Sequence, residues 1–443
     1  MVPEEELSEK VTIFNGDIFS RKEVEQTSKA ISDRLAESGY TFANVNAIPD
    51  IDKENRTVSF VFAIDPAKRV YVRRINISGN TTTRDEVIRR ELRQVEGGWL
   101  STKNVRRSKV RLDRLSFFDD VNIETPAVPG TEDQVDVNIR VKEKQTGSMM
   151  FGLGYSDSDG ILLQASINQK NLFGSGRELD LSIDTSKISK SARIRYFNPY
   201  YTVNGVSRGF YLTYTDIDAA EADLSRYINE TLSLGVNYRV PLSEHNSFSF
   251  SFGPDRSKLS ATDGTPDEIL AYIEVHPDDW YLKTTASWSH DTRDSILYPT
   301  SGFNFRLLGE ASIPGSEVDY YKTGLNFSWH LPTISNVVLK FSGDMGYGDA
   351  YGDTEIFPFY KNYYAGGSNS VRGYKARSLG PRDSNGDPFG GTRRVVGGVD
   401  LLFPFPGSEK KDKRLSLFVD GGMVFGQNED VDLDALRYSY GVG

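Results

Sequence analysis

The sequence contains no cysteine and only four histidines among its 443 residues. Without cysteine there is no disulfide framework and no thiolate zinc site, and so few histidines supply a metal centre poorly. No run reaches the ~18 apolar residues of a membrane-spanning helix. Basic side chains are outnumbered, and the net charge of −10 argues against nucleic acid as the main partner. The composition therefore predicts no metal, no cofactor and no nucleic-acid ligand.

Aromatic residues, in contrast, make up 12% of the chain, almost all of them Tyr and Phe. The missing hydrophobic run excludes only helical membrane proteins. A transmembrane β-barrel alternates polar and apolar residues, so its mean hydropathy stays low, as it does here at −0.45. The composition leaves a barrel open.

Residues 1–145 have an α+β pattern that occurs twice. Ser20 precedes a helical pattern as its N-cap, and a strand pattern follows at 58–64. Ser101 and the strand pattern at 135–141 repeat this order about 80 residues later, as in a tandem array. We therefore predict a partial module at 1–67, without its opening strand and first helix. A complete β-α-α-β-β module is expected at 68–145.

From residue 146 onward the helical period stops and strands of about ten residues alternate between apolar and polar side chains. About thirteen such strands are visible, and a fourteenth begins near Arg437. A soluble β-sandwich or propeller would also alternate. However, no blade-like repeat occurs, and short turns such as 174–176 contrast with long loops such as 254–279. The pattern favours a transmembrane β-barrel over 146–443.

One connection, 348–392, is too long for a structureless loop and too rich in Phe and Tyr for disorder. Its most polar stretch is Val371, Arg372, Gly373 and Tyr374. We expect an ordered loop in which Arg372 is committed to a specific partner.

Together these features resemble the BamA family, the insertases with polypeptide-transport-associated (POTRA) modules and a barrel in the outer-membrane β-barrel assembly machinery. The resemblance covers essentially all 443 residues. Besides the Val-Arg-Gly-aromatic motif and the module order, it rests on short segments at 70–75, 96–100, 134–137, 146–148, 198–201 and 358–360.

Family members have five modules and sixteen barrel strands, so this sequence corresponds to part of the fourth module, the fifth module and about fourteen strands. The acidic start also lacks the basic segment of a signal peptide. We therefore interpret the sequence as truncated. In the family, the first and last strands pair weakly and form a lateral gate. Here the first strand is rich in glycine, which weakens pairing, and the expected seam residues are Gly147, Met149, Phe151, Gly152 and Gly154.

The family also folds this long loop into the barrel, where its arginine meets acidic residues. On alternation alone, Asp400 and Asp420 point inward, because their neighbours Val399 and Val419 continue the apolar phase. Two carboxylates could take one guanidinium, or they could simply line a hydrated lumen. With the resemblance, we expect Arg372 to pair with both and to latch the loop to the wall.

Residues 66–114 hold fourteen basic and five acidic side chains. This excess could be a solvated helical surface or a docking face for acidic proteins or lipid headgroups. The resemblance places a partner lipoprotein near Arg89, Arg90 and Glu91.

The resemblance implies a non-enzymatic assembly factor of the Gram-negative outer membrane, with its modules in the periplasm. Its partners would be unfolded outer-membrane proteins, periplasmic lipoproteins and membrane lipid. The alternative is a related transporter that exports one partner protein. No catalytic site is expected, since Ser289, His290 and Asp291 alternate between faces. The stretch 383–387 lacks the glycine and glutamate of a calcium loop.

Overall fold

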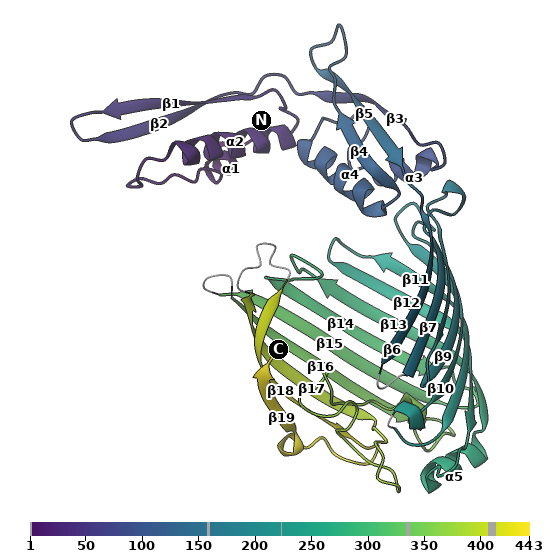
Figure 1. Ribbon diagram of the computed structural model, residues 1–443. Coiled ribbons are helices and arrows are strands. Elements are labelled where there is room, and N and C mark those ends of the chain that lie inside the picture. Colours follow the sequence, from purple (N-terminus) through teal and green to yellow (C-terminus); the bar gives the residue numbers. More distant parts are fainter. Residues whose placement is uncertain (1, 157–159, 223, 334–336, 406–412) are drawn as a thin grey trace. The chain divides into compact units, whose positions relative to one another are not determined.

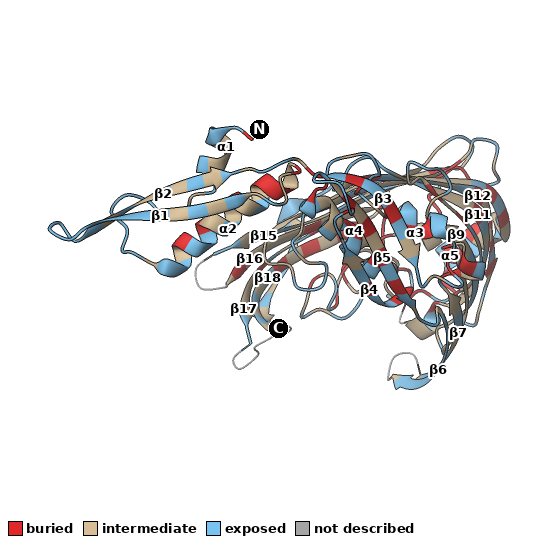
Figure 2. Ribbon diagram, turned by 90° about the horizontal axis from the view of Figure 1, so that it is seen from above, coloured by how far each residue is buried: buried red, intermediate tan, exposed pale blue. Residues whose placement is uncertain are grey.

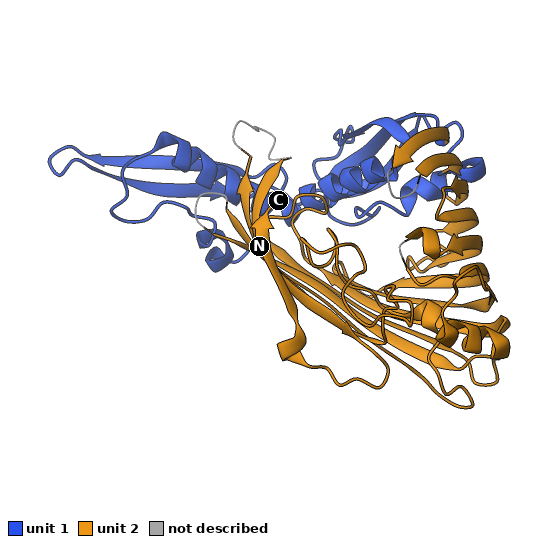
Figure 3. Ribbon diagram, turned by 60° about the horizontal axis from the view of Figure 1, so that its bottom comes forward, with its two compact units in different colours: residues 1–147, 170–176 blue, residues 148–169, 177–443 orange. Residues whose placement is uncertain are grey.

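The computed structural model describes residues 2–156, 160–222, 224–333, 337–405 and 413–443. The chain divides into two compact units (Figure 3). Unit 1 consists of residues 1–147 and 170–176, and unit 2 consists of residues 148–169 and 177–443.

The first module of unit 1 is built on one long helix and a β-hairpin (Figure 1). Helix α2 (Arg21–Glu37) begins where the Ser20 hydroxyl accepts a hydrogen bond from the Glu23 amide. Strands β1 (Asn44–Asp52) and β2 (Thr57–Asp65) pair in antiparallel. The sequence reading missed β1, because Pro49 interrupts it, but proline is tolerated on an edge strand.

A short helix, α1 (Glu4–Ser8), precedes α2. The partial module, which was expected to lack its first helix, therefore has a short helix before α2. With five residues and no side-chain cap, α1 is too short for a periodic signal.

The second module has the predicted β-α-α-β-β order. Its elements are β3 (Tyr71–Ser78), α3 (Asp85–Arg89), α4 (Thr102–Leu115), β4 (Phe118–Glu124) and β5 (Gln134–Glu143). β5 lies in the middle of the sheet, parallel to β3 and antiparallel to β4. Its alternate residues Val135, Val137, Ile139 and Val141 are at most 3% exposed. They meet Val87, Ile88 and Leu112 from the helices, and each such side chain contributes about 1.5–3 kcal/mol on burial. Figure 2 colours the buried residues red.

Unit 2 is a single curved antiparallel sheet of 14 strands (Figure 1). In chain order the strands are β6 (Gly147–Ser156), β7 (Gly160–Gln169), β8 (Glu178–Thr185), β9 (Ser189–Asn198), β10 (Ser207–Asp218), β11 (Ile228–Pro241), β12 (Asn246–Ser260), β13 (Asp278–Asp291), β14 (Gly302–Ser312), β15 (Tyr320–Pro332), β16 (Val338–Ala350), β17 (Arg393–Pro404), β18 (Arg414–Phe425) and β19 (Arg437–Val442). Each strand pairs with its neighbour in the chain, and β6 and β19 form the two edges. The predicted fold class, α+β modules followed by a large antiparallel sheet, is confirmed.

The alternation divides the sheet into two faces. On β18, Leu417 and Val419 are 48% and 55% exposed, whereas Asp420 is 2% exposed on the opposite face. We call the face that carries Asp420 the inner face, because the connection between β16 and β17 packs against it.

One loop boundary differs from the expectation. β12 continues to Ser260, and the connection to β13 contains helix α5 (Asp267–Val275), so the loop is shorter than 254–279. Among the described residues, no helix is long and apolar enough to cross a membrane.

Candidate functional site

The segment 351–392 between β16 and β17 brings Val371 and Arg372 to the inner face. Val371 is fully buried in a small cluster with Ala365, Leu379, Val396 and Val424. Two of these residues belong to β17 and β18, so the cluster fixes the loop on the sheet. Burial of Val371 thus fixes the backbone from which the Arg372 side chain extends.

Arg372 lies between two carboxylates. Its Nε and Nη2 donate to Asp420 at 2.7 Å each, and its Nη2 also lies 2.8 Å from Oδ1 of Asp400. The Arg372 backbone amide donates to Asp420 at 3.0 Å. Both aspartates are 2% exposed. The Arg372 guanidinium therefore binds Asp420 through two parallel hydrogen bonds and also contacts Asp400. Such bidentate, charge-assisted pairs are the strongest that arginine forms.

Strand register explains how two aspartates reach one guanidinium. Asp400 on β17 is opposite Phe418, and Asp420 on β18 is opposite Gly398, so the carboxylates are diagonal neighbours on one face. A Cβ at Gly398 would lie 2.8 Å from Asp420 Oδ1, so only glycine leaves room for that carboxylate.

Two further residues complete the cluster, and sequence reasoning missed both. The Phe418 ring centroid lies 3.7 Å from the Arg372 guanidinium carbon, a cation–π contact. Lys340 on β16 donates to Asp400 at 3.1 Å. Both share the strand phase of the aspartates, so the same alternation could have found them.

Gly373 and Tyr374 carry the loop on toward the edge strand. Gly373 has a φ of 87°, which glycine adopts at little cost. The Tyr374 hydroxyl donates to the Tyr438 carbonyl of β19 at 3.1 Å. The four-residue motif thus contacts β17, β18 and β19 at once.

The loop has a second polar attachment to the sheet, which the sequence did not predict. Lys361 Nζ lies 3.3 Å from Glu310 Oε1 on β14, and the Tyr320 hydroxyl donates to the same oxygen at 2.7 Å. The ammonium also lies 5.2 Å and 5.3 Å from the ring centroids of Tyr320 and Tyr281. No sequence signal links Lys361 to Glu310, because the path of the loop decides which strand it meets.

The expected seam strand β6 is exposed almost throughout. Met149 and Phe151 are 66% and 77% exposed and lie on one face. Gly152 and Gly154 face Gln164 and Leu162 of β7, and Gly147 begins the strand. β6 is an edge strand, so one side of its backbone has no neighbouring strand within the described sheet.

The three proposed docking residues have different surroundings. Arg89 is exposed, donates to Asp85 at 2.5 Å and reaches the Ile75 carbonyl. Arg90 is partly buried beside Gly176. Glu91, which was expected on the exposed basic face, is 4% exposed and accepts from Arg111 at 2.6 Å. The end of the short helix α3 turns this side chain toward α4.

A carboxylate at the end of β5 organises the loop before α3. Glu143 accepts hydrogen bonds from the backbone amides of Thr81, Thr82 and Thr83 and from the Thr81 hydroxyl, at 2.6–3.1 Å. Burial raises the pKa of Glu143, but these hydrogen bonds outweigh it and lower the pKa to about 2. Within unit 1, Asn171 donates to Thr83 at 2.9 Å, and the Arg84 amide donates to the Gly174 carbonyl at 2.9 Å.

The structure brings together no catalytic or metal set in its described part. His290 contacts Asn246 at 2.9 Å, while Asp291 pairs with Arg293. The Asp383 carboxylate accepts the amides of Asn385 and Asp387, as in an ordinary turn. Within those residues, no three acidic or histidine side chains could hold a metal ion.

A partial and a complete β-α-α-β-β module followed by an antiparallel sheet, with a long loop anchored on the inner face, define the class of POTRA-and-barrel proteins. The Omp85 superfamily domain matches residues 171–443, and the POTRA model, described as a surface antigen variable number repeat, matches 1–67 and 70–144. The chain belongs to the Omp85 superfamily.

Individual relatives agree with this assignment. The chain is 33% identical over 96% of its length to the outer membrane protein assembly factor BamA of Neisseria meningitidis, and 28% identical to that of Nitratidesulfovibrio vulgaris. A crystal structure of BamA from Haemophilus ducreyi lacking POTRA domains 1–3 has 30% identity and a TM-score of 0.76, covering 99% of this chain and 90% of that one. CdiB from Acinetobacter baumannii, at 14% identity and a TM-score of 0.51, shares the fold alone.

The chain spans about half the length of the curated relatives it matches, 55% for the Neisseria protein and 53% for the Nitratidesulfovibrio protein.

Proposed function

We propose that this chain is the membrane part, with two adjoining modules, of an assembly factor that folds β-barrel proteins and inserts them into the bacterial outer membrane. The 14-stranded sheet lies in the outer membrane and the modules lie in the periplasm. The work is conformational, because no bond of the substrate is made or broken, and the protein is not an enzyme.

The observation that carries this proposal is strand β6. It has an exposed apolar face and three glycines, which weaken its pairing with a neighbouring strand. In lipid, every backbone polar group needs a partner, so a lone substrate strand cannot enter on its own. A weakly paired strand at a seam in the barrel supplies that partner by strand addition.

The modules would receive the substrate first. In the complete second module, β4 pairs only with the central strand β5 within the described residues, so an extended chain can add to its other edge by backbone hydrogen bonds. Unfolded outer-membrane proteins are the substrates that fit such an edge.

Periplasmic lipoproteins of the assembly complex are the proposed partners of the basic second module. The Arg89 side chain pairs with Asp85 and Glu96 and is still 44% exposed, so its guanidinium can also reach a carboxylate of a partner. Glu91 acts differently from the expectation: it holds Arg111 on α4 and so shapes the surface from within. Outer-membrane lipid surrounds the apolar face of the sheet.

The test is a folding assay with the full chain in phospholipid vesicles. An unfolded eight-stranded barrel protein is added, and its folding is followed by heat-modifiable migration on gels. We expect folding to speed up by about tenfold or more over empty vesicles, a barrier reduction of at least 1.4 kcal/mol. The control vesicles contain an equal amount of a porin, which has a barrel but no modules. Equal rates in the two kinds of vesicle would refute the proposal, and an exporter of one soluble partner would give that result.

A further inference from the structure

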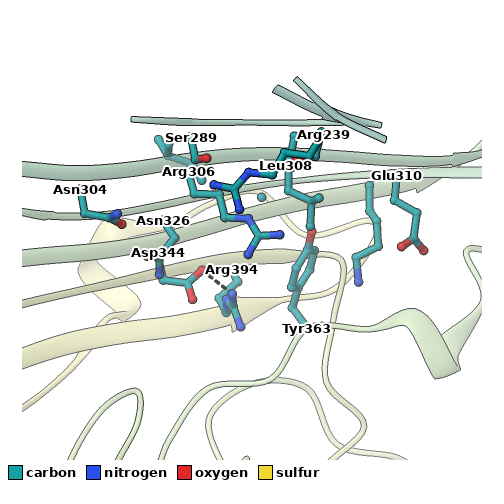
Figure 4. Close-up of a pocket in the computed structure, with 15 residues that line it drawn as sticks. Arg239, Ser289, Asn304, Arg306, Leu308, Glu310, Asn326, Asp344, Tyr363 and Arg394 are labelled. Atoms are coloured by element: carbon teal, nitrogen blue, oxygen red, sulfur yellow. Dashed lines mark hydrogen bonds and ion pairs between the residues drawn. The ribbon is translucent and has the colours of Figure 1, made fainter. Parts of the chain in front are cut away.

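A cavity of about 740 Å³ opens on the inner face of the sheet, away from the Arg372 cluster (Figure 4). Strands β11 to β17 contribute its wall, and Tyr363 of the long loop closes one side. Most of the residues that line it are polar, with hydroxyls such as Ser289 and amides such as Asn304 and Asn326. The proposed folding function leaves this cavity unexplained.

The charges around the cavity are unbalanced. Four basic side chains line it, Arg239, Arg306, Lys322 and Arg394, against the two carboxylates of Glu310 and Asp344. The wall therefore carries a net charge of two positive, in a chain whose net charge is −10.

Both carboxylates of the cavity are already engaged. Asp344 pairs with Arg394 (Figure 4). Glu310 pairs with Lys361 and Tyr320. Neither is therefore available to neutralise the remaining two arginines.

Arg306 contributes a positive charge to the cavity wall that no carboxylate balances. Its side chain is exposed and reaches into the cavity (Figure 4). Among the described residues it has no hydrogen-bond or ion-pair partner. Arg239 gives one hydrogen bond, to Ser247 at 3.1 Å, and Ser247 in turn contacts Ser289 at 2.8 Å. Ser289 is the cross-strand neighbour of Arg306, so the pair of hydroxyls leads from Arg239 to the strand position opposite Arg306.

We propose that this cavity binds a phosphate group, either free phosphate or a phosphate monoester. A phosphate monoester carries nearly two negative charges at neutral pH and three acceptor oxygens. That charge matches the excess of the wall. Two guanidinium forks, with the hydroxyl of Ser289 and the amides of Asn304 and Asn326, supply more donors than those oxygens need.

A single carboxylate fits less well. It would bring one negative charge and leave the other arginine unneutralised. Arginine rings and clusters are also the usual lining of anion- and phosphate-selective pores. The geometry therefore favours phosphate over a monovalent anion.

The test is calorimetric titration of the full chain, in micelles of an uncharged detergent, with inorganic phosphate and with chloride as the monovalent control. We expect saturable binding of phosphate and none of chloride. Arg306→Gln should weaken phosphate binding by about tenfold or more. Arg306→Lys should fall between the two, because lysine keeps the charge but not the fork.

The matched control is Arg193→Gln. Arg193 on β9 is also exposed and partnerless among the described residues, but it does not line the cavity. Binding should stay within about twofold of the parent in this variant. Phosphate binding that is absent, or that survives Arg306→Gln unchanged in a variant with normal heat-modifiability, would mean a merely hydrated cavity and overturn the proposal.

A second readout uses the ligand's own titration. Glycerol phosphate should bind more tightly as pH rises through about 6, where its second proton leaves, while arginine keeps its charge. Loss of that pH dependence in Arg306→Gln would support the site, and its persistence would count against it. Competition by short-chain phosphatidic acid identifies the source: displacement at lower concentrations than glycerol phosphate points to a lipid headgroup, and equal displacement to a soluble phosphate.

Discussion

At Arg372, one guanidinium satisfies two aspartates that are almost fully shielded from water. Removing one member of such a buried group leaves charges without a partner, which costs far more than the intact group contributes. Asp400 would keep Lys340, but among the described residues Asp420 would keep only the backbone amide of position 372. The cluster therefore fits a structural latch, the role we propose for it.

Arg372→Ala is expected to destabilise the sheet by about 3 kcal/mol and to expose the 351–392 loop to protease. The measurements are the heat-modification midpoint and limited proteolysis of the full chain. Arg372→Lys should recover little, because lysine lacks the planar fork. An unchanged midpoint together with unchanged protease protection would show that Arg372 does not latch the loop to the sheet.

The Lys361–Glu310 pair gives a second prediction for the same loop. Lys361→Met leaves Glu310 without its cation and should cost about 3 kcal/mol. Adding Glu310→Gln should recover part of that loss, since the orphaned charge disappears. The coupling in this double-mutant cycle, measured from unfolding midpoints, should exceed about 0.5 kcal/mol. Additive losses would show that the two residues act independently.

The two attachments were not equally predictable. Asp400 and Asp420 follow from strand alternation, because period two fixes which face a residue takes. Glu310 and Lys361 meet only because the loop crosses the inner face. For Glu91 the prediction was wrong. An Arg-Arg-Glu stretch in a basic segment predicts an exposed side chain, but the turn after α3 buries it.

Among the elements, β5 and the loop before α3 depend on one carboxylate. The pKa of Glu143 is depressed to about 2 in the folded module. Because the pKa is lower in the folded module than the unfolded value of 4.5, ionised Glu143 stabilises the folded module at pH values above 4.5. This stabilisation is lost as the pH falls toward 2. The module should therefore resist opening at pH 7 and loosen progressively below about pH 4.5.

Glu143→Gln tests this at constant pH. It should cost about 2 kcal/mol at pH 7, because an amide accepts the backbone hydrogen bonds more weakly than a carboxylate. Hydrogen exchange of peptides from 70–144 in the full chain measures the loss. The difference between parent and variant should shrink as pH falls to 3, and a constant difference would contradict the charge argument.

Strand β6 gives the second prediction at this scale. A Cβ at Gly152 or Gly154 would meet β7 side chains at 3.6 Å, an ordinary contact. Gly152→Val with Gly154→Val should therefore fit and strengthen β6, since valine favours strands. If easy exposure of β6 matters, slower hydrogen exchange in β6 should accompany slower substrate folding. Slower hydrogen exchange in β6 with an unchanged rate of substrate folding would show that the two glycines are not needed for function.

At the scale of the whole molecule, the proposed gate predicts the effect of closing the seam. In a full-length version, a disulfide from Met149→Cys to a cysteine in the final strand should block growth under oxidising conditions. A reductant should restore it. A disulfide between two central strands serves as the control, since it leaves the seam free. Growth with the seam crosslinked would exclude a lateral gate.

The sequence by itself determined the order and type of the elements: two modules, about fourteen alternating strands and one long loop. Local periodicity and capping encode these features, because they depend on residues close together in the chain. Only the tertiary structure decided which distant groups meet: the Phe418 ring under Arg372, Glu310 beside Lys361, and the arginines of the phosphate cavity. Such contacts depend on strand register and loop path, which are fixed by the packing of the whole sheet.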